Sequence, residues 1–136
     1  MQLDSYLHFN GQCEEAFKFY EKVLGGKIAM KMTFGESPMA QQSSPEFRDK
    51  IIHMRLEVGN RILMGSDAPP DRYSRPQGFS LSLITKDAAE TERLFNELSK
   101  GGKVIMPLAK TFWSLSFAMF EDRFGISWMV NCEQAA

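Results

Sequence analysis

The sequence predicts an α+β fold made of two βαβββ modules, each with a four-stranded sheet and one helix. Each half of the chain contains one segment whose apolar residues recur at i, i+3, i+4 and i+7, as on one face of a helix. Each half also contains four short segments that are apolar or alternate between apolar and polar residues, as strands do. A shift of 75 residues lays Tyr20 on Phe95 and Val23 on Leu98, which indicates an internal duplication.

The first module is expected over residues 1–66. Its helix, residues 14–24, should end at Gly25-Gly26, because glycine tolerates the backbone conformation found at helix C-termini. The polar segment 35–50 contains two prolines and shows no periodicity, so we expect a surface loop there. The strands of this module are expected at 5–10, 27–34, 51–58 and 61–66.

The second module is expected over residues 79–136, after a linker at 67–78 that carries three prolines. Its helix is expected at 87–100 and its strands at 79–84, 103–106, 116–121 and 126–132. The two modules should form a single domain over residues 1–136, because a chain of this length can bury one sizeable core. Each helix covers one face of its sheet, and the bare faces of two modules can close around a cavity.

Composition and charge exclude several classes of binding partner. With 16 basic and 17 acidic residues the formal net charge is −1, and no basic cluster of the kind that binds a nucleic-acid duplex is present. No apolar run reaches the roughly 18 residues of a membrane span, and the N-terminus does not resemble a secretory signal. We therefore expect a cytoplasmic protein with no nucleic-acid or membrane partner. Its cysteines, Cys13 and Cys132, should be free thiols, although Cys13 stands near a helix start, where thiolate character can rise.

Three stretches carry a family resemblance. They are residues 6–26, 53–67 and 110–133, the last of which contains the segments DRFG and SWMVN. Together they resemble the PhnB-like branch of the vicinal-oxygen-chelate superfamily, which contains glyoxalase I, bleomycin-resistance proteins and extradiol dioxygenases. The resemblance implies the glyoxalase/bleomycin-resistance fold of duplicated βαβββ modules, a small organic ligand and a homodimer.

The metal-dependent members of this superfamily use four ligands, usually His and Glu, on the first and last strands of each module. Carried onto this sequence, those positions fall on Ser5, Leu63 or Met64, Ser80 and Met129. Hydroxyl and thioether groups do not replace imidazole and carboxylate around a divalent ion. We therefore expect no metal and no other cofactor. The alternative is a divalent metal ion in a rearranged site that uses His8 or His53.

If the ligand positions face the cavity, neighbours of the same parity face it too. The expected ligand-binding pocket consists of Ser5, Leu7, Phe9, Met64, Ser80, Ser82, Trp113, Ser127, Met129 and Asn131. A mainly apolar lining with a few hydroxyl and amide groups is typical of a site for a small organic molecule. His8 should point to the face opposite Ser5. His53 is the candidate catalytic residue, because imidazole titrates near neutral pH and can act as a general base.

These observations predict a small-molecule-binding protein of the glyoxalase/bleomycin-resistance type that lacks the usual metal ligands. The alternative is a metal-dependent lyase, isomerase or dioxygenase with a rearranged site that uses His8 or His53. A further alternative is a metal-free enzyme in which His53 and a carboxylate act as acid and base.

Overall fold

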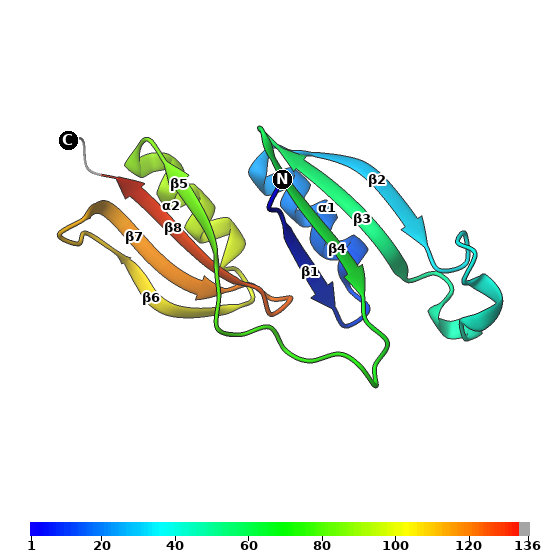
Figure 1. Cartoon of the computed structure of the whole chain (residues 1–136). Helices are drawn as coiled ribbons and strands as arrows, with labels where there is room; N and C mark the ends of the chain where they lie inside the picture. The colour runs from blue at the N-terminus through cyan, green and yellow to red at the C-terminus, as the bar shows by residue number, and fades with distance from the viewer. Residues whose placement is uncertain (134–136) are drawn as a thin grey trace. The chain divides into compact units, whose positions relative to one another are not determined.

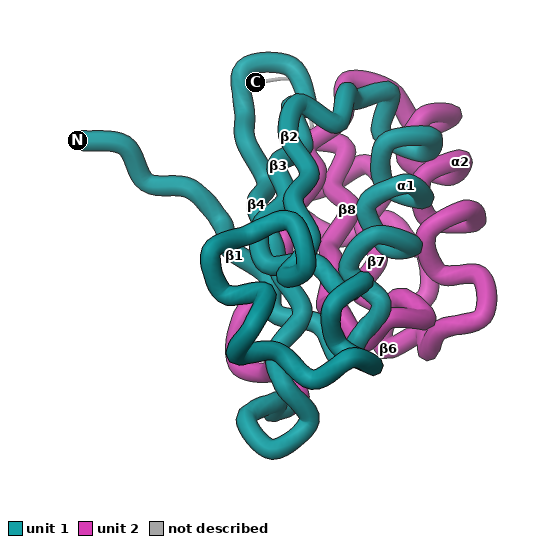
Figure 2. Tube along the Cα trace, turned by 90° about the vertical axis from the view of Figure 1, so that its right-hand side faces the viewer, with its two compact units in different colours: residues 1–74 teal, residues 75–136 magenta. Residues whose placement is uncertain are grey.

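The computed structural model describes residues 1–133. The chain divides into two compact units, Met1–Ser74 and the part that begins at Arg75 (Figure 2). The boundary lies inside the segment 67–78 that was expected as a linker. Within the described chain, no helix has the length and the apolar run that a membrane span requires.

Unit 1 is a βαβββ module (Figure 1). Its elements are β1 (Ser5–Phe9), α1 (Cys13–Leu24), β2 (Lys27–Thr33), β3 (Ile51–Val58) and β4 (Arg61–Asp67). The sheet has the order β1-β4-β3-β2; β1 and β4 are parallel and the other pairs antiparallel. Two short 3₁₀ helices, η1 (Ala40–Gln42) and η2 (Pro45–Phe47), lie in the segment between β2 and β3 that was expected as a loop.

The second unit repeats this plan and confirms the predicted duplication. Its elements are β5 (Leu81–Thr85), α2 (Ala88–Leu98), β6 (Lys103–Ala109), β7 (Ser114–Glu121) and β8 (Ser127–Glu133). The order β5-β8-β7-β6, with β5 parallel to β8, matches that of unit 1.

Several strand ends differ from the sequence prediction by one residue, and those of β5, β6 and β7 differ by more. β5 begins at Leu81, two residues later than expected. β6 continues to Ala109, although Pro107 was expected to begin a loop. β6 is an edge strand, and an edge strand tolerates a proline because one row of its backbone N–H groups has no partner to lose. β7 begins at Ser114, two residues earlier than expected, and β4 includes Asp67, which was assigned to the linker.

The core of unit 1 lies between α1 and the sheet. The rings of Phe9 in β1 and Phe17 in α1 meet edge to face at 6.0 Å, and both side chains are fully buried. Met54 and Leu56 of β3 are also fully buried, because the alternation of the strand turns both toward the helix. α1 ends at Gly25, whose φ of +71° favours glycine.

The core of unit 2 is built in the same way. Leu94 and Leu98 of α2 pack over a sheet that contributes Phe120, Trp128 and Val130. The N-terminus of α2 is capped by the carboxylate of Asp87, which accepts a hydrogen bond from the backbone N–H of Glu90 at 2.7 Å.

The buried carboxylate of Asp67 ties three elements of unit 1 together. It accepts the backbone N–H of Cys13, the first residue of α1, and that of Ile51, the first residue of β3, each at 2.9 Å. Burial raises the pKa of Asp67 above its ordinary value, and these two hydrogen bonds act in the opposite direction. Asp67 therefore sets where α1 and β3 begin relative to the end of β4.

Candidate functional site

Each helix covers one face of its sheet and leaves the other face without a helix. We call the face of β1-β4-β3-β2 turned away from α1 open face 1, and the face of β5-β8-β7-β6 turned away from α2 open face 2. In Figure 1, α1 lies behind the strands of unit 1. Open face 1 carries Tyr6, His8, Lys27, Met30, Met32, His53, Arg55, Glu57, Ile62, Met64 and Ser66.

A cluster of three rings lies on open face 1. The Tyr6 ring is stacked on that of His53, with centroids 5.6 Å apart, and is tilted against that of His8 at 5.2 Å. The hydroxyl of Tyr6 lies 3.1 Å from Nδ1 of His53, so the two groups form a hydrogen bond across β4. This bond fixes the imidazole ring and leaves Nε2 as the nitrogen that a bound molecule can meet.

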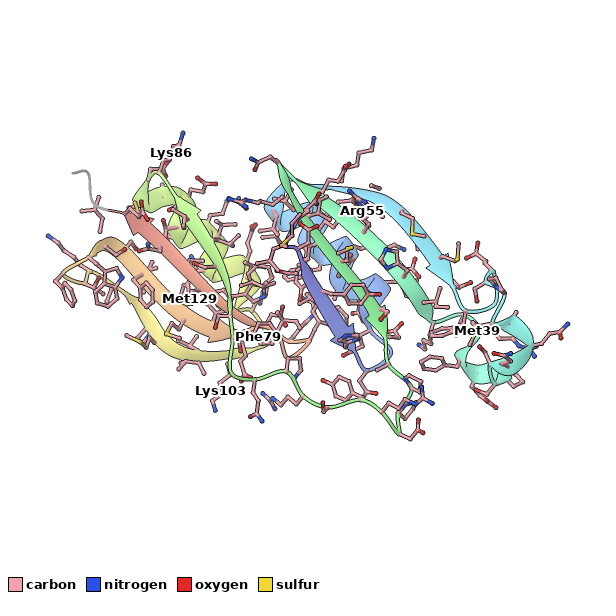
Figure 3. All side chains as sticks on the ribbon, viewed as in Figure 1. Met39, Arg55, Phe79, Lys86, Lys103 and Met129 are labelled. Atoms are coloured by element: carbon pink, nitrogen blue, oxygen red, sulfur yellow. The ribbon has the colours of Figure 1, made fainter. Side chains whose placement is uncertain are left out.

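Arg55 lies on the same face, two residues along β3 from His53 (Figure 3). Its register partners on the neighbouring strands are Met30 of β2 and Met64 of β4. Arg55 is half-buried, and its guanidinium forms no ion pair or hydrogen bond with any residue in 1–133. Tyr6 is the partner of Met64 on its other side, so this row of the sheet runs from a cation to a phenol.

Open face 2 has a different chemistry. It carries Ser82, Ile84, Phe117, Met119, Ser127, Met129 and Asn131. The amide oxygen of Asn131 is buried and accepts no hydrogen bond within the described chain. Trp113, in the connection before β7, contacts the ring of Phe117 at 5.4 Å. The acidic group nearby, Glu121, is neutralised by the guanidinium of Arg75 at 2.6 and 2.8 Å.

The structure corrects the predicted lining of the first strand. Leu7 and Phe9 are 1% exposed and belong to the core under α1, and Ser5 shares their side of β1. Tyr6 and His8 occupy the open face instead.

The physical reason is the length of one connection. Three residues (10–12) join β1 to α1, whereas two (86–87) join β5 to α2. The position predicted at Ser5 was counted back from Phe19 and Tyr20 of the helix, so the extra residue in this connection shifts β1 by one residue. A one-residue shift moves every side chain of a strand to the other face.

The remaining pocket candidates that lie within strands point to the side of the sheet that was predicted. Met64 lies on open face 1; Ser82, Ser127, Met129 and Asn131 lie on open face 2. Figure 3 shows Met129 on β8. Ser80 is half-buried immediately before β5, and Trp113 is half-exposed in the connection before β7. Their role in binding stays a prediction.

The donor set does not fit the metal centre that the resemblance implies. The open-face positions on the first and last strands are Tyr6, His8, Met64 and Ser66 in unit 1, and Ser82, Ile84, Met129 and Asn131 in unit 2. One imidazole among phenol, hydroxyl, thioether, amide and alkyl groups is a poor set for a divalent ion. Throughout residues 1–133, His, Cys, Asp and Glu form no group of three or more that could hold a metal ion.

Two further expectations concern single residues. His53 was considered together with a carboxylate, but the hydrogen-bond partner that the described chain offers it is the phenol of Tyr6. Cys13 is the first residue of α1, yet burial, followed by the charges of Asp67 and Glu14, raises the pKa of its thiol far above the ordinary value. Cys13 is therefore not an activated nucleophile, and both Cys13 and Cys132 are buried and free of disulfides.

Tyr6 and Arg55 were not among the predicted site residues. Tyr6 was missed because the face of β1 was assigned from the wrong parity. Arg55 stands two residues from His53 on the polar side of an alternating strand, and this pattern alone assigns it no role. Its lack of an acidic partner could not be seen without the tertiary structure.

Comparison with known proteins places the chain among sequences of similar length and fold. The family model of the Glyoxalase/Bleomycin resistance protein/Dioxygenase superfamily matches residues 2–130. Protein YjdN of Escherichia coli is 35% identical, and the match covers 96% of this chain and 95% of YjdN. The crystal structure of protein PA1353 from Pseudomonas aeruginosa is 50% identical, with a TM-score of 0.90 and 99% of each chain covered. The PhnB protein from Bacillus cereus, 22% identical, shares the fold with a TM-score of 0.84, covering 97% of this chain and 99% of its own.

Proposed function

The chain belongs to the Glyoxalase/Bleomycin resistance protein/Dioxygenase superfamily, and from that premise we propose that it binds a small organic molecule without a metal ion. The observation that carries this proposal is the composition of open face 1. There the stacked rings of Tyr6 and His53 adjoin a thioether, Met64, and a guanidinium without an acidic partner, Arg55. Apolar and aromatic side chains with a few placed polar groups are the usual lining of a small-molecule site.

Open face 2 contributes to the proposal through its thioether and polar groups. Met129 occupies the position in unit 2 that Met64 occupies in unit 1. Each is the register partner of the second residue of the first strand in its unit, Ser82 for Met129 and Tyr6 for Met64. Each methionine gives the open face of its own unit a soft, adaptable surface that suits an organic ligand. The unsatisfied amide oxygen of Asn131 offers a place for a ligand hydrogen-bond donor.

The test uses a neutral apolar dye, N-phenylnaphthylamine, whose fluorescence rises in an apolar site. We expect saturable binding in the presence of a metal chelator, and a dissociation constant at least about tenfold higher in Met64→Gln, because burying a methionine contributes about 1.5–3 kcal/mol. Met39→Gln is the matched control, since Met39 is an exposed methionine in the connection between β2 and β3 (Figure 3). Binding that requires metal, or that is equally weakened by Met39→Gln, refutes the proposal.

One observation favours the alternative, a metal-dependent lyase, isomerase or dioxygenase with a rearranged site. His8 lies on the same open face as His53, with Tyr6 in ring contact with both. Metal analysis of protein purified without a chelator or an affinity tag tests it. Near-stoichiometric Ni, Zn, Mn or Fe that is lost in the His8→Ala/His53→Ala double variant would establish the alternative. Background metal in both proteins would leave the metal-free binding function standing.

We also propose a homodimer in the cytoplasm, with no nucleic-acid or membrane partner. The dimer is proposed because members of this superfamily commonly form homodimers. The cytoplasmic location is proposed because the thiols of Cys13 and Cys132 are free. Light scattering of the purified protein tests the assembly: a mass of two chains is expected, and a mass of one chain contradicts it.

A further inference from the structure

Arg55 stands out on open face 1 because the fold does not require a charge at its position. Arg55 is the register partner of Met64, and the residue in the corresponding place of unit 2, partner of Met129, is Met119. The same βαβββ sheet is therefore built with a thioether at this point in one unit and a guanidinium in the other. Methionine is compatible with the packing at this position, so the positive charge of Arg55 is not needed to build the sheet.

The protein itself leaves this charge unmatched. In the described chain Arg55 is half-buried and has no ion pair. Glu57 is the nearest acidic residue along β3, and Lys27 of β2 stands directly opposite it in the register. Glu57 forms no ion pair with Arg55 in the described chain, and its register partner carries the opposite charge. In unit 2 the open-face acid Glu121 is bound by Arg75, so neither carboxylate marks a partner for Arg55.

The neighbours of Arg55 define what else the ligand must satisfy. Tyr6 lies two strands away in the same row, beyond Met64, so about 10 Å separates the backbones of Arg55 and Tyr6 at the usual strand spacing of about 4.8 Å. Met64 offers an apolar patch between them, and the Tyr6 ring at the far end is stacked on that of His53, which lies on β3 two residues from Arg55. A molecule that matches the side chains of this row needs an acid group at the Arg55 end and a flat apolar body at the Tyr6 end.

We infer that the ligand is an organic anion whose acid group is bound by the guanidinium of Arg55, while its apolar body lies against Met64, Tyr6 and His53. This inference rests on the proposed binding function and names its ligand class. The planar guanidinium presents paired N–H donors that match the two oxygens of a carboxylate or sulfonate. The charge thus selects acids over neutral molecules of the same shape.

The test compares two dyes of nearly the same shape, the anionic anilinonaphthalene sulfonate and the neutral N-phenylnaphthylamine. We expect the wild-type protein to bind the anion more tightly. Arg55→Met should raise the dissociation constant for the anion about 10- to 100-fold, the usual contribution of hydrogen bonds to charged groups, and leave that for the neutral dye within about twofold. Methionine is the substitution of choice, because unit 2 folds with Met119 at the corresponding place. Arg61→Met, at the exposed start of β4, is the matched control and should change neither constant.

The outcomes separate this inference from the proposed function. Saturable binding of the neutral dye with no preference for the anion, or an equal loss of both dyes in Arg55→Met, overturns the inference and leaves the binding function in place. Failure of both dyes to bind overturns both. Equal weakening of anion binding by Arg61→Met shows a general charge effect and also overturns the role of Arg55. Circular dichroism of each variant confirms that the fold is intact.

Discussion

Replacing Asp67 by asparagine tests how the open face is held in place. The two carboxylate oxygens of Asp67 each accept one backbone N–H, from Cys13 at the start of α1 and from Ile51 at the start of β3. Asparagine keeps one oxygen and replaces the other with an NH₂ group, which cannot accept. One buried N–H therefore loses its acceptor, whichever way the amide is turned.

The expected loss follows from that count. A buried donor left without a partner costs about 1–3 kcal/mol, so Asp67→Asn should lower the free energy of unfolding at neutral pH by about that amount. The site should respond as well, because Ile51 lies two residues before His53 and Asp67 pairs with Phe9, next to His8. A shift of either strand start would disturb the hydrogen bond between Tyr6 and His53.

Urea unfolding followed by circular dichroism measures the effect. Asp87→Asn is the matched control, since Asp87 caps α2 through a single exposed hydrogen bond that asparagine replaces almost without loss. Asp67→Asn should be clearly destabilised and Asp87→Asn nearly unchanged. An Asp67→Asn variant as stable as the wild type, or equal losses in the two variants, would refute the reasoning.

The pH dependence supplies a second test of the same residue. Burial raises the pKa of Asp67 in the folded state, so the folded protein holds this proton more tightly than the unfolded chain does. Its stabilising contribution is complete below the unfolded pKa of about 3.9 and is lost as the pH rises through the raised folded value. The deficit of Asp67→Asn relative to the wild type should therefore be largest near pH 4 and shrink toward neutral pH. A deficit that grows with pH would contradict the direction of the shift.

Three further outcomes follow from the packing. The thiols of Cys13 and Cys132 should resist a thiol reagent at pH 8 in the native protein and react fully in urea, because both are buried and burial raises the pKa of Cys13; rapid native labelling would contradict this. Gly65→Ala should cost about 1–3 kcal/mol in thermal or urea unfolding, since its Cβ would lie 2.9 Å from the ring of Phe17, and an unchanged stability would show that the ring can move. Asp122→Asn should lower the free energy of unfolding by about 1–3 kcal/mol, because its buried carboxylate accepts three N–H groups, and urea unfolding that matches the wild type would contradict this.

Local patterns predicted most of the fold because the signals that set each element are local. The alternation over residues 51–58 predicted both ends of β3, and the helical spacing over 14–24 predicted α1 to within one residue. β6 was cut short because Pro107 reads as a break in any isolated segment. Only its place at the sheet edge makes that proline acceptable.

The candidate site was predicted less well. For β8 the predicted side was right, and Met129 and Asn131 lie away from the helix. For β1 it was wrong, because the extra residue in the connection to α1 is invisible to a count from the helix. Tyr6 therefore took the place on the open face that Leu7 was expected to have.

The amino-acid sequence by itself determined the duplicated βαβββ plan, the helices and strands of each half, and the two sets of side chains that alternate along every strand. These properties depend on backbone preference and on the spacing of apolar residues within short segments. The tertiary structure decided which set faces the helix, because that choice depends on how α1 packs against a sheet whose strands come from distant parts of the chain. It also brought Tyr6 against His53, 47 positions apart, and left Arg55 beside them without an acidic partner. Contacts between distant segments form only when the whole sheet is assembled, so no local pattern encodes them.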